Sequence, residues 1–283
     1  MTGMDDYTTP PTNATVLVTG ATKGLGRYLV TELTKAGAAV LVHGRDADRV
    51  AALVDELSAV NAEAGPRGYV ADLSDLDQVR GLAERVERDH GRLDALVHNA
   101  TAAGSTDVSR RISVQGHELN MAVNHLAPLL LSRRLIPLLT ASAPARIVNV
   151  ASIGQQEIDF DDFGFTRGFE IMEAYCRSKL AMIMSAFDLA AELAGTGVTV
   201  NAVHPAHLMD TEGIRALGFT AQVPISHGGQ PTLRVITDPK LDTVTGEYFN
   251  RYDIDKAHPQ AYRTADRARL ARISAEAIGA YLR

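Results

Sequence analysis

The sequence predicts a single α/β domain built on a doubly wound parallel sheet. Short β-branched runs alternate with longer stretches of helical period along nearly the whole chain. The short runs are apolar at consecutive positions, which is typical of parallel strands covered by helices on both faces. The first run also leads directly into a glycine-rich turn, a usual opening of this class of fold. With 283 residues, the chain is long enough to bury one large core.

Strands and helices can be assigned in order from these patterns. The strand candidates are residues 15–19, 38–43, 68–72, 94–99, 145–152 and 198–204, followed by a last strand at 247–250. Apolar residues at three- and four-residue spacing predict helices at 24–36, 46–63, 75–90, 112–139 and 172–195, and a closing helix within 258–282. The polar segment 1–13 is interpreted as a mobile tail. No repeat or linker interrupts the rest, so residues 14–283 should form one domain.

Composition and charge argue against several classes of function. The chain carries 28 Lys and Arg against 34 Asp and Glu, a net charge of −6, which disfavours a nucleic-acid or anionic-membrane surface. No apolar run approaches the ~20 residues that span a bilayer, and the N-terminus is acidic rather than signal-like. The one cysteine, Cys176, cannot form an internal disulfide and is interpreted as structural. A cytoplasmic protein without membrane or nucleic-acid partners is therefore expected.

The glycine-rich turn is a candidate phosphate-binding site. It reads TGATKGLG, with Gly20, Gly24 and Gly26 between the first strand and the first helix. Glycines let the backbone turn tightly and approach a pyrophosphate, whose negative charge then faces the N-terminus of the helix. A tight turn that only packs closely is the alternative. At the first strand of an alternating chain, the pattern favours dinucleotide binding.

The end of the second strand indicates which dinucleotide binds. An NAD-specific site usually places a carboxylate there for the ribose 2′-hydroxyl, whereas an arginine accommodates a 2′-phosphate. Here Gly44 occupies the position and Arg45 follows it, with Lys23 in the glycine-rich turn as a second candidate cation. Asp46 is interpreted as the cap of the next helix. We therefore expect NADP(H), with NAD(H) as the less favoured alternative.

Polar residues follow three further strands on the side where a ligand would lie. Asp72 follows the third strand and could hold the adenine amino group, while it or Ser74 could equally cap the next helix. Asn99 and Ala100 end the fourth strand. Ser152 ends the fifth, where its hydroxyl could polarise a carbonyl oxygen, although serine at such a position is often only a cap or part of a turn.

Tyr175 and Lys179 form the candidate catalytic pair. They lie four residues apart in a helical stretch, so their side chains share one face. A nearby ammonium favours the ionised phenol, which moves its pKa from about 10 toward working pH and suits it to proton exchange with a substrate. The same spacing is common on exposed helices, so the pair carries weight only together with the other motifs.

A proline predicts a local opening in the fourth helical stretch. Pro128 has no backbone N–H, so the carbonyl of Asn124, four residues earlier, should lack its helical partner. That carbonyl would then bind water or a side chain. The two interpretations are a simple kink and a helix opened to hold a water molecule at an active site.

These motifs together resemble the short-chain dehydrogenase/reductase family. In chain order they are TGATKGLG, Asp72, VHNA, Asn124, Ser152 and YCRSK, and the resemblance runs over residues 14–280. It implies a Rossmann fold in which Tyr175 is the general acid/base and Ser152 orients the substrate carbonyl. Lys179 would lower the pKa of Tyr175 and hold the nicotinamide ribose, and Asn124 would anchor a water of the proton relay. The implied cofactor site comprises Gly20, Thr22, Lys23, Gly24, Leu25, Gly26, Arg45, Asp72, Leu73, Asn99, Ala100, Tyr175, Lys179, Pro205 and Thr211.

Further details resemble one branch of that family, the retinol dehydrogenases and WW-domain oxidoreductase-like proteins. Ser152 and Tyr175 are farther apart than is usual in the family, and the insert between them is similar to that branch, as are VNHLAPLLLS and TGEYF. An arginine such as Arg45 accompanies NADP(H) there. Thr101 and Ala206 depart from the family's glycines and add bulk near the nicotinamide site.

The segment 205–226 is interpreted as an apolar substrate lid that excludes water on closure, with ordinary core packing as the alternative. Its loop from Thr211 to Gly228 is shorter than usual for retinoid enzymes, so a retinoid substrate does not follow. His204 and His207 are interpreted as pocket lining, and no metal site is expected. The opposite wall of the pocket would come from the insert, through Phe160, Phe163, Phe165 and Met172.

The sequence thus predicts an NADP(H)-dependent oxidoreductase that interconverts a carbonyl and an alcohol on an apolar or aromatic small molecule. The alternatives are a redox-silent, cofactor-binding regulator and a dehydratase or epimerase that acts through transient oxidation. A homodimer or homotetramer is compatible with this fold.

Overall fold

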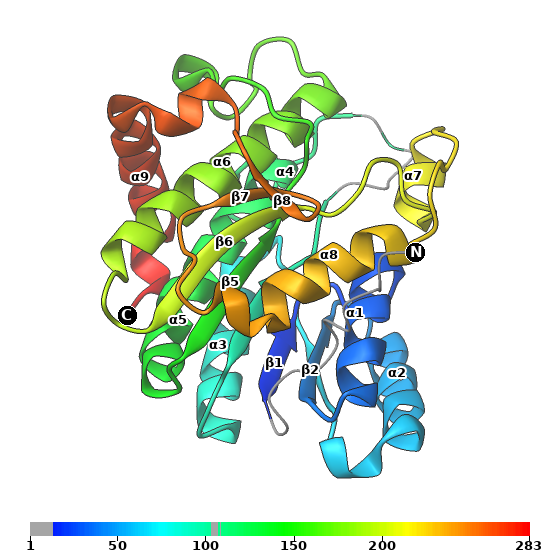
Figure 1. The fold of residues 1–283 in the computed structure, drawn as a ribbon. Coiled ribbons are helices and arrows are strands. Elements are labelled where there is room, and N and C mark those ends of the chain that lie inside the picture. The colour runs from blue at the N-terminus through cyan, green and yellow to red at the C-terminus, as the bar shows by residue number, and fades with distance from the viewer. Residues whose placement is uncertain (1–13, 103–106, 108) are drawn as a thin grey trace.

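The computed structural model describes residues 14–102, 107 and 109–283, with an eight-stranded sheet at its centre (Figure 1). The predicted tail, 1–13, lies outside these residues. The strand order is β3-β2-β1-β4-β5-β6-β7-β8, in which neighbours from β3 to β7 pair in parallel and β8 runs antiparallel to β7. The chain winds outward in one direction from β1 and in the other from β4, which confirms the doubly wound fold. Its switch point lies between these two strands, so a ligand crevice is expected at their carboxyl ends.

The seven predicted strands are confirmed, with ends that differ by at most two residues. The eighth, β8, was not predicted because its three residues are exposed and two of them are acidic, so it carries no apolar signal. The strands are β1 (Thr15–Val18), β2 (Ala39–Gly44), β3 (Arg67–Val70), β4 (Ala95–His98), β5 (Ala145–Val150), β6 (Val198–His204), β7 (Tyr248–Asn250) and β8 (Asp253–Asp255).

Helices cover both faces of the sheet (Figure 1). One layer contains α1 (Gly24–Lys35), α2 (Ala47–Val60) and α8 (Ser226–Thr237), and the other contains α3 (Leu76–Asp89), α5 (Ala127–Ala141) and α6 (Ile171–Glu192), against which α9 (Thr264–Ile278) packs. Alternate strand residues reach opposite layers: Val16 and Val18 contact the first and Leu17 the second. Double coverage explains why the strands are apolar at consecutive positions. Within the described residues, no helix has the length and apolar composition needed to cross a membrane.

Several short helices complete the chain. They are α4 (Leu119–Met121), the π-helix η2 (Ala122–Leu126), α7 (Glu212–Ala216), and the 3-10 helices η1 (Ala62–Ala64), η3 (Phe160–Asp162), η4 (Pro239–Leu241), η5 (Pro259–Tyr262) and η6 (Gly279–Tyr281).

The predicted helix at 112–139 begins seven residues too early. Residues 112–118 form a turn in which Ile112 bridges to Glu118 and Gly116 has a φ of +84°. The side chain of Glu118 then accepts a hydrogen bond from the backbone N–H of Met121 at 2.9 Å, which caps the helix that begins at Leu119. The left-handed glycine and the cap therefore set the helix start, and the apolar spacing alone did not reveal them.

Helix α8 was not predicted because it contains two glycines and a proline, residues that normally argue against a helix interior. The glycines have a packing reason. A Cβ atom at Gly229 would overlap the ring of Tyr28 on α1, and one at Gly228 would overlap the sulfur of Met209. The close approach of α8 to its neighbours therefore requires residues that weaken its sequence signal.

Candidate active site

The glycine-rich turn adopts the backbone that the sequence predicted. Gly20 has a φ of +64° and Gly24 a φ of +51°, in the left-handed region that glycine tolerates. A Cβ atom at Gly26 would overlap the carbonyl oxygen of Gly20 and the amide nitrogen of Asn99. The first turn of α1 therefore sits directly on the preceding loop, and the side chain there must be a hydrogen atom.

Asn99 holds this turn against the end of β4. Its amide nitrogen Nδ2 donates to the carbonyl oxygens of Thr19 at 2.9 Å and Gly20 at 3.1 Å. The backbone N–H groups of Asn99 and Ala100 both donate to Oγ1 of Thr19, at 3.0 and 3.1 Å. These bonds join the carboxyl ends of β1 and β4 at the switch point of the sheet.

His43 is a contributor to this site that the sequence analysis missed. Its Nδ1 accepts from the backbone N–H of Gly20 at 3.2 Å, and its Nε2 lies 3.1 Å from the carbonyl oxygen of Ala71. Burial lowers the pKa of His43 to about 4, so the ring is neutral at pH 7 with its proton on Nε2. A polar residue near the end of an otherwise apolar strand was the available signal. His43 fixes the turn to the ends of β2 and β3.

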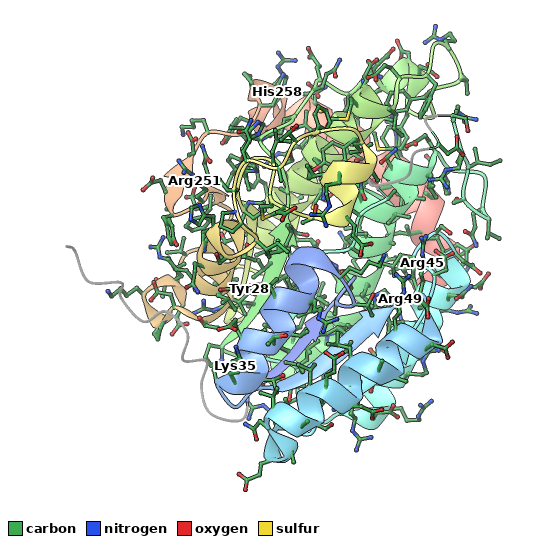
Figure 2. All side chains as sticks on the ribbon, turned by 90° about the vertical axis from the view of Figure 1, so that its right-hand side faces the viewer. Tyr28, Lys35, Arg45, Arg49, Arg251 and His258 are labelled. Atoms are coloured by element: carbon green, nitrogen blue, oxygen red, sulfur yellow. The ribbon has the colours of Figure 1, made fainter. Side chains whose placement is uncertain are left out.

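The predicted cations lie near the same turn. Arg45 is exposed immediately before α2, and Arg49 projects from the first turn of that helix (Figure 2). Lys23 forms an ion pair with Glu212 at the start of α7. Asp46 accepts from the N–H of Arg49 at 3.1 Å, which confirms its role as a helix cap.

The carboxylate at the end of β3 belongs to a turn. Oδ1 of Asp72 accepts from the backbone N–H of Ser74 at 2.9 Å, and the N–H of Asp72 donates to Gln78. The cap of α3 is Asp75, which accepts from the N–H of Asp77 at 3.0 Å, so neither Asp72 nor Ser74 caps that helix. Leu73, next to Asp72, is buried in the core.

Lys179 and Tyr175 lie together on α6 at the carboxyl end of β5. The Lys179 side chain is 3% exposed, its Nζ donates to the carbonyl oxygen of Val150 at 2.8 Å, and the same Nζ lies 5.8 Å from the centre of the Tyr175 ring. Burial lowers the pKa of Lys179 to about 7, so a large fraction of the amine is neutral near pH 7.

The pKa of Tyr175 differs in direction from the expectation. Burial raises it, and a hydrogen bond with Ser152 offsets only part of that rise. The helical spacing of the pair predicted that Lys179 would lower it. That expectation fails for the structure because the environment that buries the pair also suppresses the ammonium charge that would stabilise a phenolate.

Ser152 lies between β5 and this pair. Its Oγ accepts from the backbone N–H of Gly154 at 3.0 Å, and its carbonyl oxygen accepts from the hydroxyl of Tyr248 at 3.1 Å. A Cβ atom at Gly154 would lie 3.2 Å from the sulfur of Cys176 and 3.4 Å from Oγ of Ser152. Cys176 thus packs beside the site, and burial raises the pKa of its thiol.

Asn124 lies in the π-helix η2, four residues before Pro128. The helix therefore departs from the α-helical hydrogen-bond pattern just before Pro128, and the binding of water by the Asn124 carbonyl stays a prediction. The side chain of Asn124 is fully buried, its Oδ1 accepts from the N–H of Ala102 at 2.9 Å, and its Nδ2 donates to Oγ of Ser178 at 2.9 Å. Ser178 in turn donates to the carbonyl oxygen of Tyr175 at 2.7 Å. Ser178 was not predicted, and its position beside Lys179 was the only signal.

The lid segment and the aromatic residues of the insert, both expected around the substrate, differ in how deeply they are buried. The lid segment combines both interpretations: Ala206 is buried and Met209 and Ile225 pack against the core, whereas none of residues 207–227 is fully buried. Phe165, in contrast, is 2% exposed and belongs to the core beneath α6, so it cannot form a pocket wall as expected. Phe160 and Phe163 pack against that same core.

The two histidines near the end of β6 do not form a metal site. Burial, with the nearby His207 and Arg251, lowers the pKa of His204 to about 4. Among the described residues, no cluster of His, Cys, Asp or Glu could hold a metal ion.

Comparisons with known proteins agree with this geometry. A model of the short chain dehydrogenase family matches residues 14–218. Human retinol dehydrogenase 13 is 31% identical over 94% of this chain and 84% of its own length, and human retinol dehydrogenase 14 is 31% identical over 94% and 86%. An uncharacterised protein of Mycobacterium paratuberculosis has a similar crystal structure, with a TM-score of 0.78, 25% identity and coverage of 96% of this chain and 97% of that one. The RhlG/NADP active-site complex of Pseudomonas aeruginosa has a TM-score of 0.68 and 26% identity, over 87% and 97%.

Proposed function

This chain belongs to the short-chain dehydrogenase family, and we propose that it interconverts a carbonyl and an alcohol on an apolar or aromatic small molecule with NADP(H). The observation that carries the proposal is the grouping of Ser152, Tyr175 and Lys179 at the carboxyl end of β5, beside the switch point of the sheet. Ligands bind at such a point in open α/β sheets.

The residues of the glycine-rich turn fit a dinucleotide. A side chain at Gly26 would fill the place where the loop and helix meet, and the left-handed Gly20 and Gly24 let the turn pack against Ala100 and Thr211 at the start of the first helix, where a pyrophosphate would bind. Asn99 and Ala100 would line the same crevice, with Pro205 and Thr211 on its opposite side. NADP(H) is favoured over NAD(H) because Gly44 provides no carboxylate for a ribose, and because Arg45 and Lys23 can meet a phosphate. The similar RhlG structure is an NADP complex, which supports the same choice.

A bound nicotinamide supplies or accepts the hydride. The chain's own residues handle the proton and the orientation of the substrate. The hydroxyl of Ser152 donates to the substrate oxygen and fixes its position. Tyr175 exchanges a proton with that oxygen; because burial raises its pKa, the phenol is protonated at neutral pH and ready to act as the acid in a reduction.

Lys179 and Asn124 support Tyr175. With a pKa of about 7, Lys179 can gain or lose a proton near neutral pH and so replenish the phenol. The π-helix at Asn124 leaves a backbone site where a relay water can bind. Apolar side chains of the lid segment are not buried and are therefore free to contact a substrate, among them Leu208, Ile214, Leu217 and Phe219. These residues favour an apolar substrate.

The test is NADPH consumption against a panel of ketones, aldehydes and quinones, with Tyr175→Phe as the variant. We expect turnover of at least one class, and a loss of about 10²- to 10⁴-fold in Tyr175→Phe while NADPH binding is retained. An equal loss of binding and turnover in the variant would contradict the role of Tyr175. NADPH binding without turnover of any carbonyl would instead support the regulator. A product formed without net consumption of the cofactor would support the dehydratase or epimerase.

A further inference from the structure

The start of α7 lies directly over the glycine-rich turn. A Cβ atom at Gly24 would lie 3.3 Å from Cγ2 of Thr211, the residue that caps α7. At the next residue, the carboxylate of Glu212 pairs with the ammonium of Lys23. Two successive residues of the lid segment therefore contact two successive residues of the turn.

Glu212 carries its negative charge among cations. The pKa of its carboxyl is lowered by the hydrogen bond from Lys23 first, and also by the charges of Arg49 and Arg215. Arg49 lies four residues after Arg45, the residue expected to meet a 2′-phosphate, and its charge acts on Glu212 beside Lys23. Asp46 also forms an ion pair with Arg49, with an Nε–Oδ2 distance of 3.4 Å. The carboxylates of Asp46 and Glu212 therefore partly neutralise these cations.

We propose that Glu212 is a specificity-determining residue that weakens the binding of 2′-phosphorylated dinucleotides by competing for Lys23. The proposal rests on the proposed NADP(H) site. A 2′-phosphate that approaches Lys23 must displace the carboxylate or share the site with a like charge, and either effect lowers affinity. NAD(H) has no phosphate at that position, so its binding does not require the ion pair to break.

The test compares Glu212→Gln with Asp210→Asn. Asp210 forms the equivalent exposed ion pair within the same segment, with Arg215 instead of Lys23. Dissociation constants for NADPH and NADH are measured by isothermal titration, together with 2′,5′-ADP and 5′-ADP as fragments with and without the 2′-phosphate. We expect Glu212→Gln to tighten NADPH and 2′,5′-ADP by about threefold to tenfold, the range for exposed charges acting on a dianion. NADH and 5′-ADP should change by less than about twofold, and the gain should shrink as salt is added.

Two results would overturn the proposal. If Glu212→Gln weakens NADPH and NADH equally, Glu212 holds the lid over either cofactor and does not select between them. If Asp210→Asn tightens NADPH as much as Glu212→Gln, the effect is general to the charge of the segment. The titrations do not need turnover, so failure of the proposed function can be told apart. If Glu212→Gln tightens NADPH but the protein reduces no carbonyl, the proposed function is contradicted and the role of Glu212 is still supported.

Discussion

The glycine-rich turn and the lid segment contact each other, yet they are held in different ways. The turn is fixed from the interior: buried His43 and half-buried Asn99 bind its backbone, and Gly26 permits no side chain. The lid segment contains no fully buried residue between 207 and 227; partly buried Met209 and Ile225 pack against the core, and exposed ion pairs such as Lys23–Glu212 join it to the turn. The fold therefore restricts the residues of the turn through backbone geometry and restricts the exposed residues of the lid segment far less.

The largest effect should come from Gly26→Ala. The new methyl group would overlap the backbone of Gly20, which cannot move without disturbing β1, so we expect a loss of about 3 kcal/mol or more in the free energy of unfolding. Dinucleotide binding should also be lost. Gly91→Ala is the control, since no atom lies within 4 Å of the position of its new methyl group. Chemical denaturation of both variants measures the difference, and equal stabilities would show that the turn is not dictated by its backbone.

An intermediate effect is expected in the pH dependence of stability. Lys179 has a folded pKa of about 7, below its ordinary value of 10.5, so between these values the unfolded chain binds the extra proton. Its burial therefore opposes folding most strongly below pH 7, and the free energy of unfolding should rise with pH above 7 by up to about 1.4 kcal/mol per pH unit. Lys179→Met should remove this rise. Urea unfolding of both proteins from about pH 6 to about pH 9 compares the slopes, and parallel curves would refute the burial effect.

The smallest effect should come from an exposed ion pair. Two of the contacts between the insert and the region of η5 differ in burial. Glu157 pairs with Arg263, with side chains 56% and 54% exposed, whereas the buried amide of Gln260 bonds both the N–H and the carbonyl of Ile158. We expect Glu157→Gln to cost less than about 1 kcal/mol, whereas Gln260→Ala leaves buried backbone groups unpaired and should cost about 1–3 kcal/mol. Thermal unfolding of the two variants orders them. A larger loss in Glu157→Gln would reverse the comparison.

The sequence predicted most strands because their buried residues are apolar at every position, a signal that depends little on tertiary context. It missed α8 and β8 for the reverse reason: Gly228 and Gly229 serve contacts with other elements, and β8 is entirely exposed. In the site, the glycines could be identified because their backbone requirement is local to one motif, and Asn99 because it stands in the motif VHNA, although its partners Thr19 and Gly20 are 80 and 79 residues distant. His43 and Ser178 act through partners 28 and 54 residues distant, which no spacing pattern reveals.

The direction of the Tyr175 pKa could not be predicted for a related reason. The four-residue spacing shows that Tyr175 and Lys179 share a helix face, and that part of the prediction is confirmed by the 5.8 Å separation of Nζ and the ring centre. Spacing does not show how deeply the face is buried. Since desolvation acts on both groups, its effect exceeds that of their mutual attraction.

The hydroxyl of Ser178 links two helices that meet at the site, because it accepts from Asn124 on the π-helix and donates to the backbone of Tyr175 on α6. A displacement of either helix is thereby transmitted to the other, and the separation between Asn124 and Tyr175 is preserved. A change in the outer loops that creates a new pocket would therefore leave the separation between Asn124 and Tyr175 unchanged. The two hydrogen bonds of Ser178 would then keep the chemistry constant while the substrate changes.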